Sequence, residues 1–191
     1  MFAGLIDVQG KDYMTNASGQ NFVLEVPDGD DRERRVCGDC GFIDYVNPKI
    51  VAGSVVTKGD KILLCKRAIE PRRGFWTLPA GFMEEGESVE EAAEREAREE
   101  AMADIKIERL LAVYSVPRIS QVQIMYKAEL VSDIAPGPES QEVGLFDWSE
   151  IPWRNLAFPT VVWALTHYAK IRTQSDYAPF SNPPGTDALT R

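Results

Sequence analysis

One stretch of this sequence decides the fold: residues 81–103 read GFMEEGESVEEAAEREAREEAMA. Nine of the seventeen residues at 84–100 are glutamates. Ser88 is a favourable helix N-cap, and Glu91 follows three residues later, which completes a capping box. The stretch therefore predicts a loop followed by a long helix over residues 89–103.

Three glutamates share one face of this predicted helix. At about 100° per residue, Glu99 and Glu100 lie within about 60° of Glu96 around the helix axis. The apolar side chains of the first half point to the same side, whereas a solvated acidic face would oppose the apolar stripe. Like charges four residues apart destabilise a helix by roughly 0.2–0.5 kcal/mol, and a divalent cation with oxygen ligands relieves the repulsion. This face is a candidate metal site.

The sequence around this helix alternates strand and turn signals. Further predicted elements are strands at 50–57, 61–67, 105–116, 121–131 and 143–148 and a second helix at 159–171. Pro159 suits the first turn of the second helix. We therefore expect an α+β fold, an α/β/α sandwich around a mixed sheet.

Three parts are expected along the chain. Residues 1–48 combine turn-forming clusters with short strand-like pieces, which predicts a small N-terminal β ribbon-like segment. Residues 49–172 form the main domain. Residues 173–191 are rich in proline and are expected to form an extended tail.

Composition excludes several classes of protein. The net charge is −9 over 191 residues, and no basic stripe suited to nucleic acid is visible. The longest apolar runs have about five residues, far fewer than the ~18 of a membrane span. The N-terminus lacks the features of a secretory signal, and three cysteines fit a reducing compartment. We expect a cytoplasmic protein with neither nucleic acid nor membrane as a partner.

The motif in the glutamate-rich stretch is recognisable. Gly81, Glu87 and the run Arg95-Glu96-Ala97-Arg98-Glu99-Glu100 resemble the signature of the Nudix hydrolases, Gly-x5-Glu-x7-Arg-Glu-U-x-Glu-Glu-x-Gly-U with U apolar. The late glycine of that pattern is Met102 here. The N-terminal segment, residues 76–82 and residues 136–140 look like the branch that includes FAD and ADP-ribose pyrophosphatases. The resemblance implies a mixed sheet between helices and hydrolysis of nucleoside diphosphate derivatives.

The same resemblance implies a metal centre. Glu96 and Glu100 are the expected principal ligands of Mg²⁺, or of Mn²⁺ as an alternative. Glu99 is expected to join them or to hold a bound water, and the backbone carbonyl of Gly81 is expected to supply another ligand. The metal would neutralise phosphate charge and lower the pKa of a bound water.

Other residues receive supporting roles by resemblance. Glu87 and Arg95 are expected to brace the loop against the helix. The catalytic base is left open among Glu99, Glu139 and Glu142.

Substrate contacts are expected outside the motif. Arg67, at a strand end, is a candidate phosphate contact, Tyr114 is a candidate to stack on a planar ring, and Gln121 is a further candidate contact. Cys65 is expected to be a buried small hydrophobe. His167, the only histidine, is expected to have a packing or surface role and not a catalytic one.

The N-terminal segment departs from its branch, which usually holds two C-x-x-C pairs for a structural zinc. Only Cys37 and Cys40 remain here, and residues 15–18 read TNAS where the other pair is expected. Two thiolates do not close the tetrahedral site that structural zinc prefers, so zinc is not expected.

These observations predict a Mg²⁺-dependent pyrophosphohydrolase of a dinucleotide or nucleotide-sugar. FAD, giving FMN and AMP, is the leading substrate, followed by ADP-ribose, giving AMP and ribose 5-phosphate. The alternatives are an NADH pyrophosphatase and a non-catalytic Nudix domain that senses a ligand. A silent domain is expected to lose a metal glutamate, and none is lost. A homodimer is expected by analogy with the family.

Overall fold

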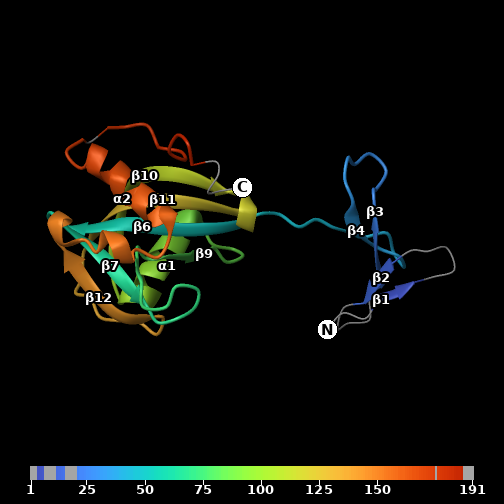
Figure 1. Cartoon of the computed structure of the whole chain (residues 1–191), viewed down its shortest axis with the longest axis horizontal. Helices are drawn as coiled ribbons and strands as arrows, with labels where there is room; N and C mark the ends of the chain where they lie inside the picture. Colours follow the sequence, from blue (N-terminus) through green and yellow to red (C-terminus); the bar gives the residue numbers. More distant parts are fainter. Residues whose placement is uncertain (1–3, 7–11, 16–20, 175, 187–191) are drawn as a thin grey trace. The chain divides into compact units, whose positions relative to one another are not determined.

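The chain contains two compact units, Met1–Asn47 and Pro48–Arg191 (Figure 1). The computed structural model describes residues 4–6, 12–15, 21–174 and 176–186. Positions 16–18, part of the stretch where the second cysteine pair was expected, lie outside the described residues. In the described part, no helix is long and apolar enough to span a membrane.

The N-terminal unit is an antiparallel sheet in which sequential strands pair. Its strands are β1 (Gly4–Ile6), β2 (Asp12–Thr15), β3 (Asn21–Glu25), β4 (Arg34–Cys37) and β5 (Ile43–Asp44). Phe22 and Val23 of β3 and Val36 of β4 are buried. Backbone hydrogen bonds at Asp39 and Cys40 lower the pKa of the Cys37 thiol. The expected ribbon-like segment is confirmed as a small β-sheet.

The main unit is built on a mixed sheet. Its strands are β6 (Lys49–Lys58), β7 (Lys61–Arg67), β8 (Trp76–Thr77), β9 (Ala80–Phe82), β10 (Ile105–Val116), β11 (Gln121–Leu130) and β12 (Ser140–Phe146). Their order is β10-β11-β6-β7-β12, with β8 paired to β7 and β9 to β6. β6 and β11 are parallel, and the other pairs are antiparallel.

Helices cover both faces of this sheet, which confirms the expected sandwich. In the described residues the α-helices are α1 (Val89–Ala101) and α2 (Pro159–Ile171), with short 3-10 turns η1 (Pro117–Ile119), η2 (Trp148–Glu150) and η3 (Trp153–Asn155). Val55 packs in a cluster with Leu165 of α2, whereas its neighbour Val56 packs with Ala97 of α1. Successive strand residues point to opposite faces, so the two helices lie on opposite sides.

Local signals explain where α1 begins and ends. The Glu91 N–H donates to Ser88 Oγ (3.2 Å), and the Ser88 N–H donates to Glu91 Oε2 (2.7 Å), which is the predicted capping box. The helix ends two residues earlier than predicted. Met102 adopts a left-handed conformation with φ +48°, and its N–H donates to the Arg98 carbonyl at 2.8 Å. Met102 thus holds the backbone conformation that glycine adopts most readily.

The segment after α2 returns to β10. The Phe180 N–H donates to the Leu111 carbonyl, and the Phe180 carbonyl accepts from Val113, both at 2.9 Å. The Phe180 ring stacks on buried His167 with the ring centroids 4.2 Å apart. His167 Nδ1 lies 2.8 Å from the Tyr114 hydroxyl. His167 therefore has the expected packing role, and buried Cys65 also behaves as expected.

Candidate active site

The acidic face of α1 lies at the edge of the core. Glu96 and Glu100 are buried, with 7% and 4% of their surfaces exposed, while the Glu99 side chain is 55% exposed. Ala92, Ala93 and Ala97 are fully buried, so the small side chains let the helix pack closely on the sheet. All three glutamates line the same pocket, as their predicted spacing requires.

Strand β9 presents its backbone to Glu96. Gly81 pairs with Ala52 of β6, and a Cβ atom added at Gly81 would overlap the Glu96 carboxylate. Because Gly81 has no side chain, the Glu96 carboxylate can lie against its backbone. Two of the predicted metal ligands, Gly81 and Glu96, are therefore close together.

Arg95 connects the loop before α1 to the acidic face. Its guanidinium donates to Glu87 at 2.6 and 3.1 Å and to the Phe82 carbonyl at 2.9 Å. It also donates to Glu96 at 2.7 Å and to Glu99 at 3.0 Å. The Arg95 hydrogen bond lowers the pKa of Glu87. Arg95 thus links Glu87 of the loop to Glu96 and Glu99 of α1.

Glu100 is the carboxylate whose surroundings most favour a cation. Burial raises its pKa to about 8, and the negative charge of Glu96 adds to the effect. Its Oε2 atom is buried and has no hydrogen-bond partner among the described residues. Burial likewise raises the pKa of Glu96. An unpartnered buried carboxylate oxygen suits a hard divalent ion such as Mg²⁺ or Mn²⁺, although no group of three or more acidic, histidine or cysteine side chains in the described residues is already arranged to hold a metal.

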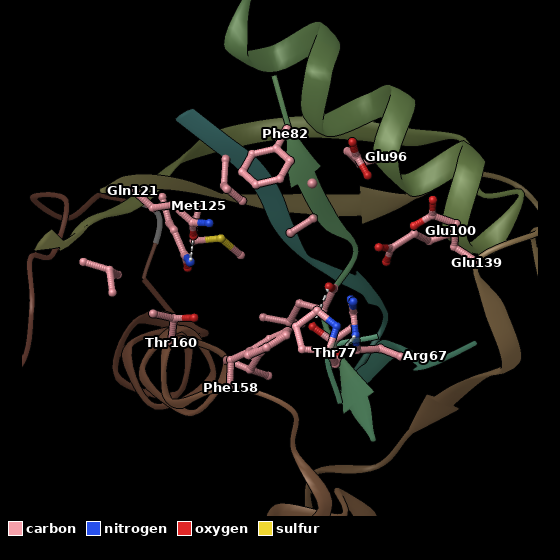
Figure 2. A pocket seen from close by; sticks show the side chains of 18 of the residues that line it. Arg67, Thr77, Phe82, Glu96, Glu100, Gln121, Met125, Glu139, Phe158 and Thr160 are labelled. Atoms are coloured by element: carbon pink, nitrogen blue, oxygen red, sulfur yellow. Dashed lines mark hydrogen bonds between the residues drawn. The ribbon is translucent and has the colours of Figure 1, made fainter. Parts of the chain in front are cut away.

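The loop before β12 adds another carboxylate. The Gly137 N–H donates to the Glu100 carbonyl at 3.1 Å, and a Cβ atom at Gly137 would overlap the Glu99 carbonyl. The Ala68 N–H donates to the Glu139 carbonyl at 2.7 Å. This docking places Glu139 in the pocket, and Figure 2 shows its side chain beside Glu100.

The pocket has a volume of about 600 Å³ and two unlike ends. Figure 2 shows Glu96, Glu100 and Glu139 on one side and Gln121, Met125 and Thr160 on the other. The acidic side suits a metal–phosphate group, and the residues labelled on the second side carry amide, thioether and hydroxyl groups. The size lies within the range of pockets for nucleotide-sized ligands.

The predicted substrate contacts fall into two groups. Arg67 and Gln121 line the pocket, and the Arg67 guanidinium lies 5.2 Å from the centroid of the Phe158 ring. Tyr114 does not reach the pocket, because strand β10 turns it into the core, where it is fully buried against α2. Glu142 is also outside the pocket lining, and its carboxylate lies 3.4 Å from Lys66 Nζ.

Sequence reasoning missed several lining residues, namely Phe82, Gln123, Met125 and Thr160, whereas Phe158 was among the aromatic residues expected to be available for stacking. The alternation Gln121–Gln123–Met125 within a predicted strand was a usable signal, because these residues share one face.

Comparisons with known proteins agree with this geometry. The family model "NUDIX domain" matches residues 47–164, and the zinc-ribbon model "Nudix N-terminal" matches residues 17–46. A crystal structure of a NUDIX hydrolase from Nitrosomonas europaea superposes with a TM-score of 0.81 at 44% identity, covering 87% of this chain and 96% of that one.

Curated relatives point to related activities. An ADP-ribose pyrophosphatase from Methanocaldococcus jannaschii is 31% identical over 156 residues, which are 79% of this chain and 87% of that protein. The NAD-capped RNA hydrolase NudC from Stutzerimonas stutzeri is 34% identical over 111 residues, covering 56% of this chain and only 38% of NudC.

Proposed function

Because this chain belongs to the Nudix hydrolase family, whose members act on diphosphate linkages, we propose that it hydrolyses the diphosphate of ADP-ribose or a related adenine dinucleotide with Mg²⁺. The observation that carries the proposal is the two-ended pocket. Carboxylates gather at one end, and the side chains labelled at the other, those of Gln121, Met125 and Thr160, are uncharged, while Arg118 also lines the pocket. A nucleotide joined through a diphosphate to a second group has the matching distribution of charge.

The proposed metal ligands are Glu96, Glu99, Glu100 and the carbonyl of Gly81. Mg²⁺, or Mn²⁺ in its place, would neutralise charge on the diphosphate and lower the pKa of water at the site. Arg95 holds Glu96 and Glu99 in position through its hydrogen bonds. The buried, unpartnered Glu100 oxygen supports this assignment.

Two further side chains have proposed roles in the reaction. Arg67 contacts a phosphate, since it lines the pocket and its positive charge acts on Glu100. Glu139 accepts a proton from the attacking water, since it lies in the pocket beside Glu100 whereas Glu142 does not line it. A carboxylate within reach of the water is the geometry that general-base catalysis requires.

We propose ADP-ribose as a better substrate than FAD. The similarity to an ADP-ribose pyrophosphatase over 87% of that protein supports this order. The expected ring-stacking contribution of Tyr114 to FAD binding loses its basis because Tyr114 is buried. NADH remains an alternative, and the NudC similarity extends over only 38% of that relative. A non-catalytic sensing domain is disfavoured, because every motif glutamate is present.

Product analysis with Mg²⁺ tests the proposal. ADP-ribose should yield AMP and ribose 5-phosphate, and FAD should yield FMN and AMP at a lower rate. Glu100→Gln and Glu96→Gln should each lower turnover by at least about 100-fold, with Glu94→Gln, on the same helix and outside the pocket lining, as the control. The proposal fails if the protein leaves both compounds intact while releasing pyrophosphate from a nucleoside triphosphate.

We also propose a homodimer in the cytoplasm. The dimer is inferred from the resemblance to the family, and the cytoplasmic location is inferred from the composition of the chain. Light scattering coupled to gel filtration checks the first, since a monomeric mass at micromolar concentration would contradict it. Imaging of the tagged full chain in cells checks the second.

A further inference from the structure

Two glutamines form a polar pair at the end of the pocket opposite the carboxylates. Gln121 and Gln123 lie on the same face of β11 and both line the pocket. Gln123 Nε2 donates to Gln121 Oε1 at 3.3 Å. This bond uses one of the two Gln123 N–H donors and leaves the Gln121 amide nitrogen and the Gln123 carbonyl oxygen available. The pair therefore presents a donor beside an acceptor.

Apolar and basic residues surround this pair, since Lys49 of β6 is the strand partner of Gln121 and Arg118 lines the same pocket. Gln123 pairs with Val51 of β6, and Val51 pairs with Phe82 of β9, so the three form a row across the sheet. Residues in such a row share a face, and all three line the pocket. Met125 is the next residue of β11 on that face and is 96% buried by the fold. The two amides thus lie beside an apolar surface, made by Val51, Phe82 and Met125, on which an uncharged ring can pack.

Phe82 offers a surface for that ring. It is 49% exposed although it lines a pocket, and Lys49 Nζ lies 5.0 Å from its centroid. Large exposed aromatic side chains inside a pocket are suited to stacking on planar ligands. Figure 2 shows Phe82 projecting into the pocket between the acidic side and the Gln121 side.

We propose that Gln121 and Gln123 read the hydrogen-bonding edge of an adenine ring stacked against Phe82. Adenine presents an exocyclic N–H donor beside a ring-nitrogen acceptor, and a glutamine amide matches that edge with two hydrogen bonds. This inference rests on the proposed function, because it assigns the adenine half of the substrate to this end and the diphosphate to the carboxylates.

The test uses two ligands that differ by one group. AMP and purine riboside 5′-monophosphate carry the same ribose and phosphate, but the second lacks the exocyclic amino group. Titration calorimetry with Mg²⁺ should give a dissociation constant about tenfold or more lower for AMP with the wild-type protein. Gln123→Met keeps the side-chain length and removes the amide, so it should reduce that ratio below about threefold.

The matched control is Gln141→Met. Gln141 is exposed on β12 and does not line the pocket, so this variant should keep the wild-type ratio. Equal binding of the two ligands to the wild-type protein, or an unchanged ratio in Gln123→Met, would overturn the inference. So would a failure of AMP to bind.

Turnover of ADP-ribose is measured in the same samples and separates the two proposals. An AMP preference that depends on Gln123, without ADP-ribose hydrolysis, refutes the proposed reaction and retains the adenine site. Hydrolysis without that preference refutes the adenine site alone.

Discussion

Glu139 and Glu142 are three residues apart, yet only Glu139 lines the pocket. Glu142 lies on β12, where its carboxylate approaches Lys66 on the neighbouring strand. Glu139 precedes β12 in the loop that docks against the end of α1. Their different positions provide a matched comparison for the catalytic base.

We expect Glu139→Gln to lower kcat by about 100-fold or more, because general-base contributions are typically 10²–10⁴-fold. Glu142→Gln should stay within about twofold of the wild type. Steady-state kinetics on ADP-ribose with saturating Mg²⁺ measures both. Equal losses in the two variants would contradict the assignment of Glu139.

His167 predicts a pH dependence of stability. Burial, together with the positive charge of Lys170, lowers its pKa in the folded protein. As pH falls below about 6.5, the unfolded chain binds the proton first, so the free energy of unfolding decreases with falling pH. The slope from this group is at most about 1.4 kcal/mol per pH unit, and it ends below the folded pKa.

The measurement is denaturant unfolding between pH 5 and 8 for the wild type and His167→Gln. Glutamine keeps a hydrogen-bonding group near the Tyr114 hydroxyl but does not titrate. The wild-type free energy of unfolding should fall more steeply below pH 6.5 than that of the variant. Parallel pH profiles would exclude this contribution of His167.

The end of α1 carries a local strain that substitution can remove. Met102 has φ +48° and is 62% exposed, so its side chain contributes little burial. A left-handed conformation costs about 1–2 kcal/mol for residues with a Cβ, whereas glycine adopts it readily but has more freedom in the unfolded chain. Met102→Gly should therefore raise the free energy of unfolding by about 0.5–1 kcal/mol.

Met102→Ala is the control, because alanine retains the Cβ and should change stability little. Denaturant unfolding of the three proteins measures the difference. Equal stability of the glycine and alanine variants would show that the conformation is not strained.

Features that depend on residues close together in the sequence were predictable, and features that depend on residues far apart were not. The start of α1 depends on Ser88 and Glu91, which are neighbours in sequence, so it was predicted correctly. The acidic face of α1 was equally local. The burial of Tyr114 depends on which face of β10 packs against α2. Tyr114 contacts His167, which lies 53 positions later in the chain, and the sequence pattern does not encode this long-range contact. Gln123 and Phe82 meet through Val51, on a third strand, for the same reason.

At the scale of the whole molecule, the N-terminal unit raises the question of metal content. The model "Nudix N-terminal" covers residues 17–46, but Cys37 and Cys40 are the only cysteines there, and the chain's single histidine is His167. Because two thiolates leave a tetrahedral site open, we predict well under one zinc per chain.

Elemental analysis of protein purified without chelator measures the ratio. A value near one zinc per chain would show that other ligands complete the site. In that case Cys40→Ser should remove the metal, and Cys65→Ser, in the other unit, should retain it.

β10 is the end strand of the main sheet. A bare end strand offers unpaired N–H and C=O groups on which another chain can add a strand. Phe180 occupies this edge at Leu111 and Val113, and the Asn182 side chain bonds the backbone of Ser115 at 2.9 Å in both directions. The residues after α2 therefore cover part of this edge, and we expect them to hinder aggregation. A chain that ends before Phe180 should form large particles in light scattering at concentrations where the full chain does not.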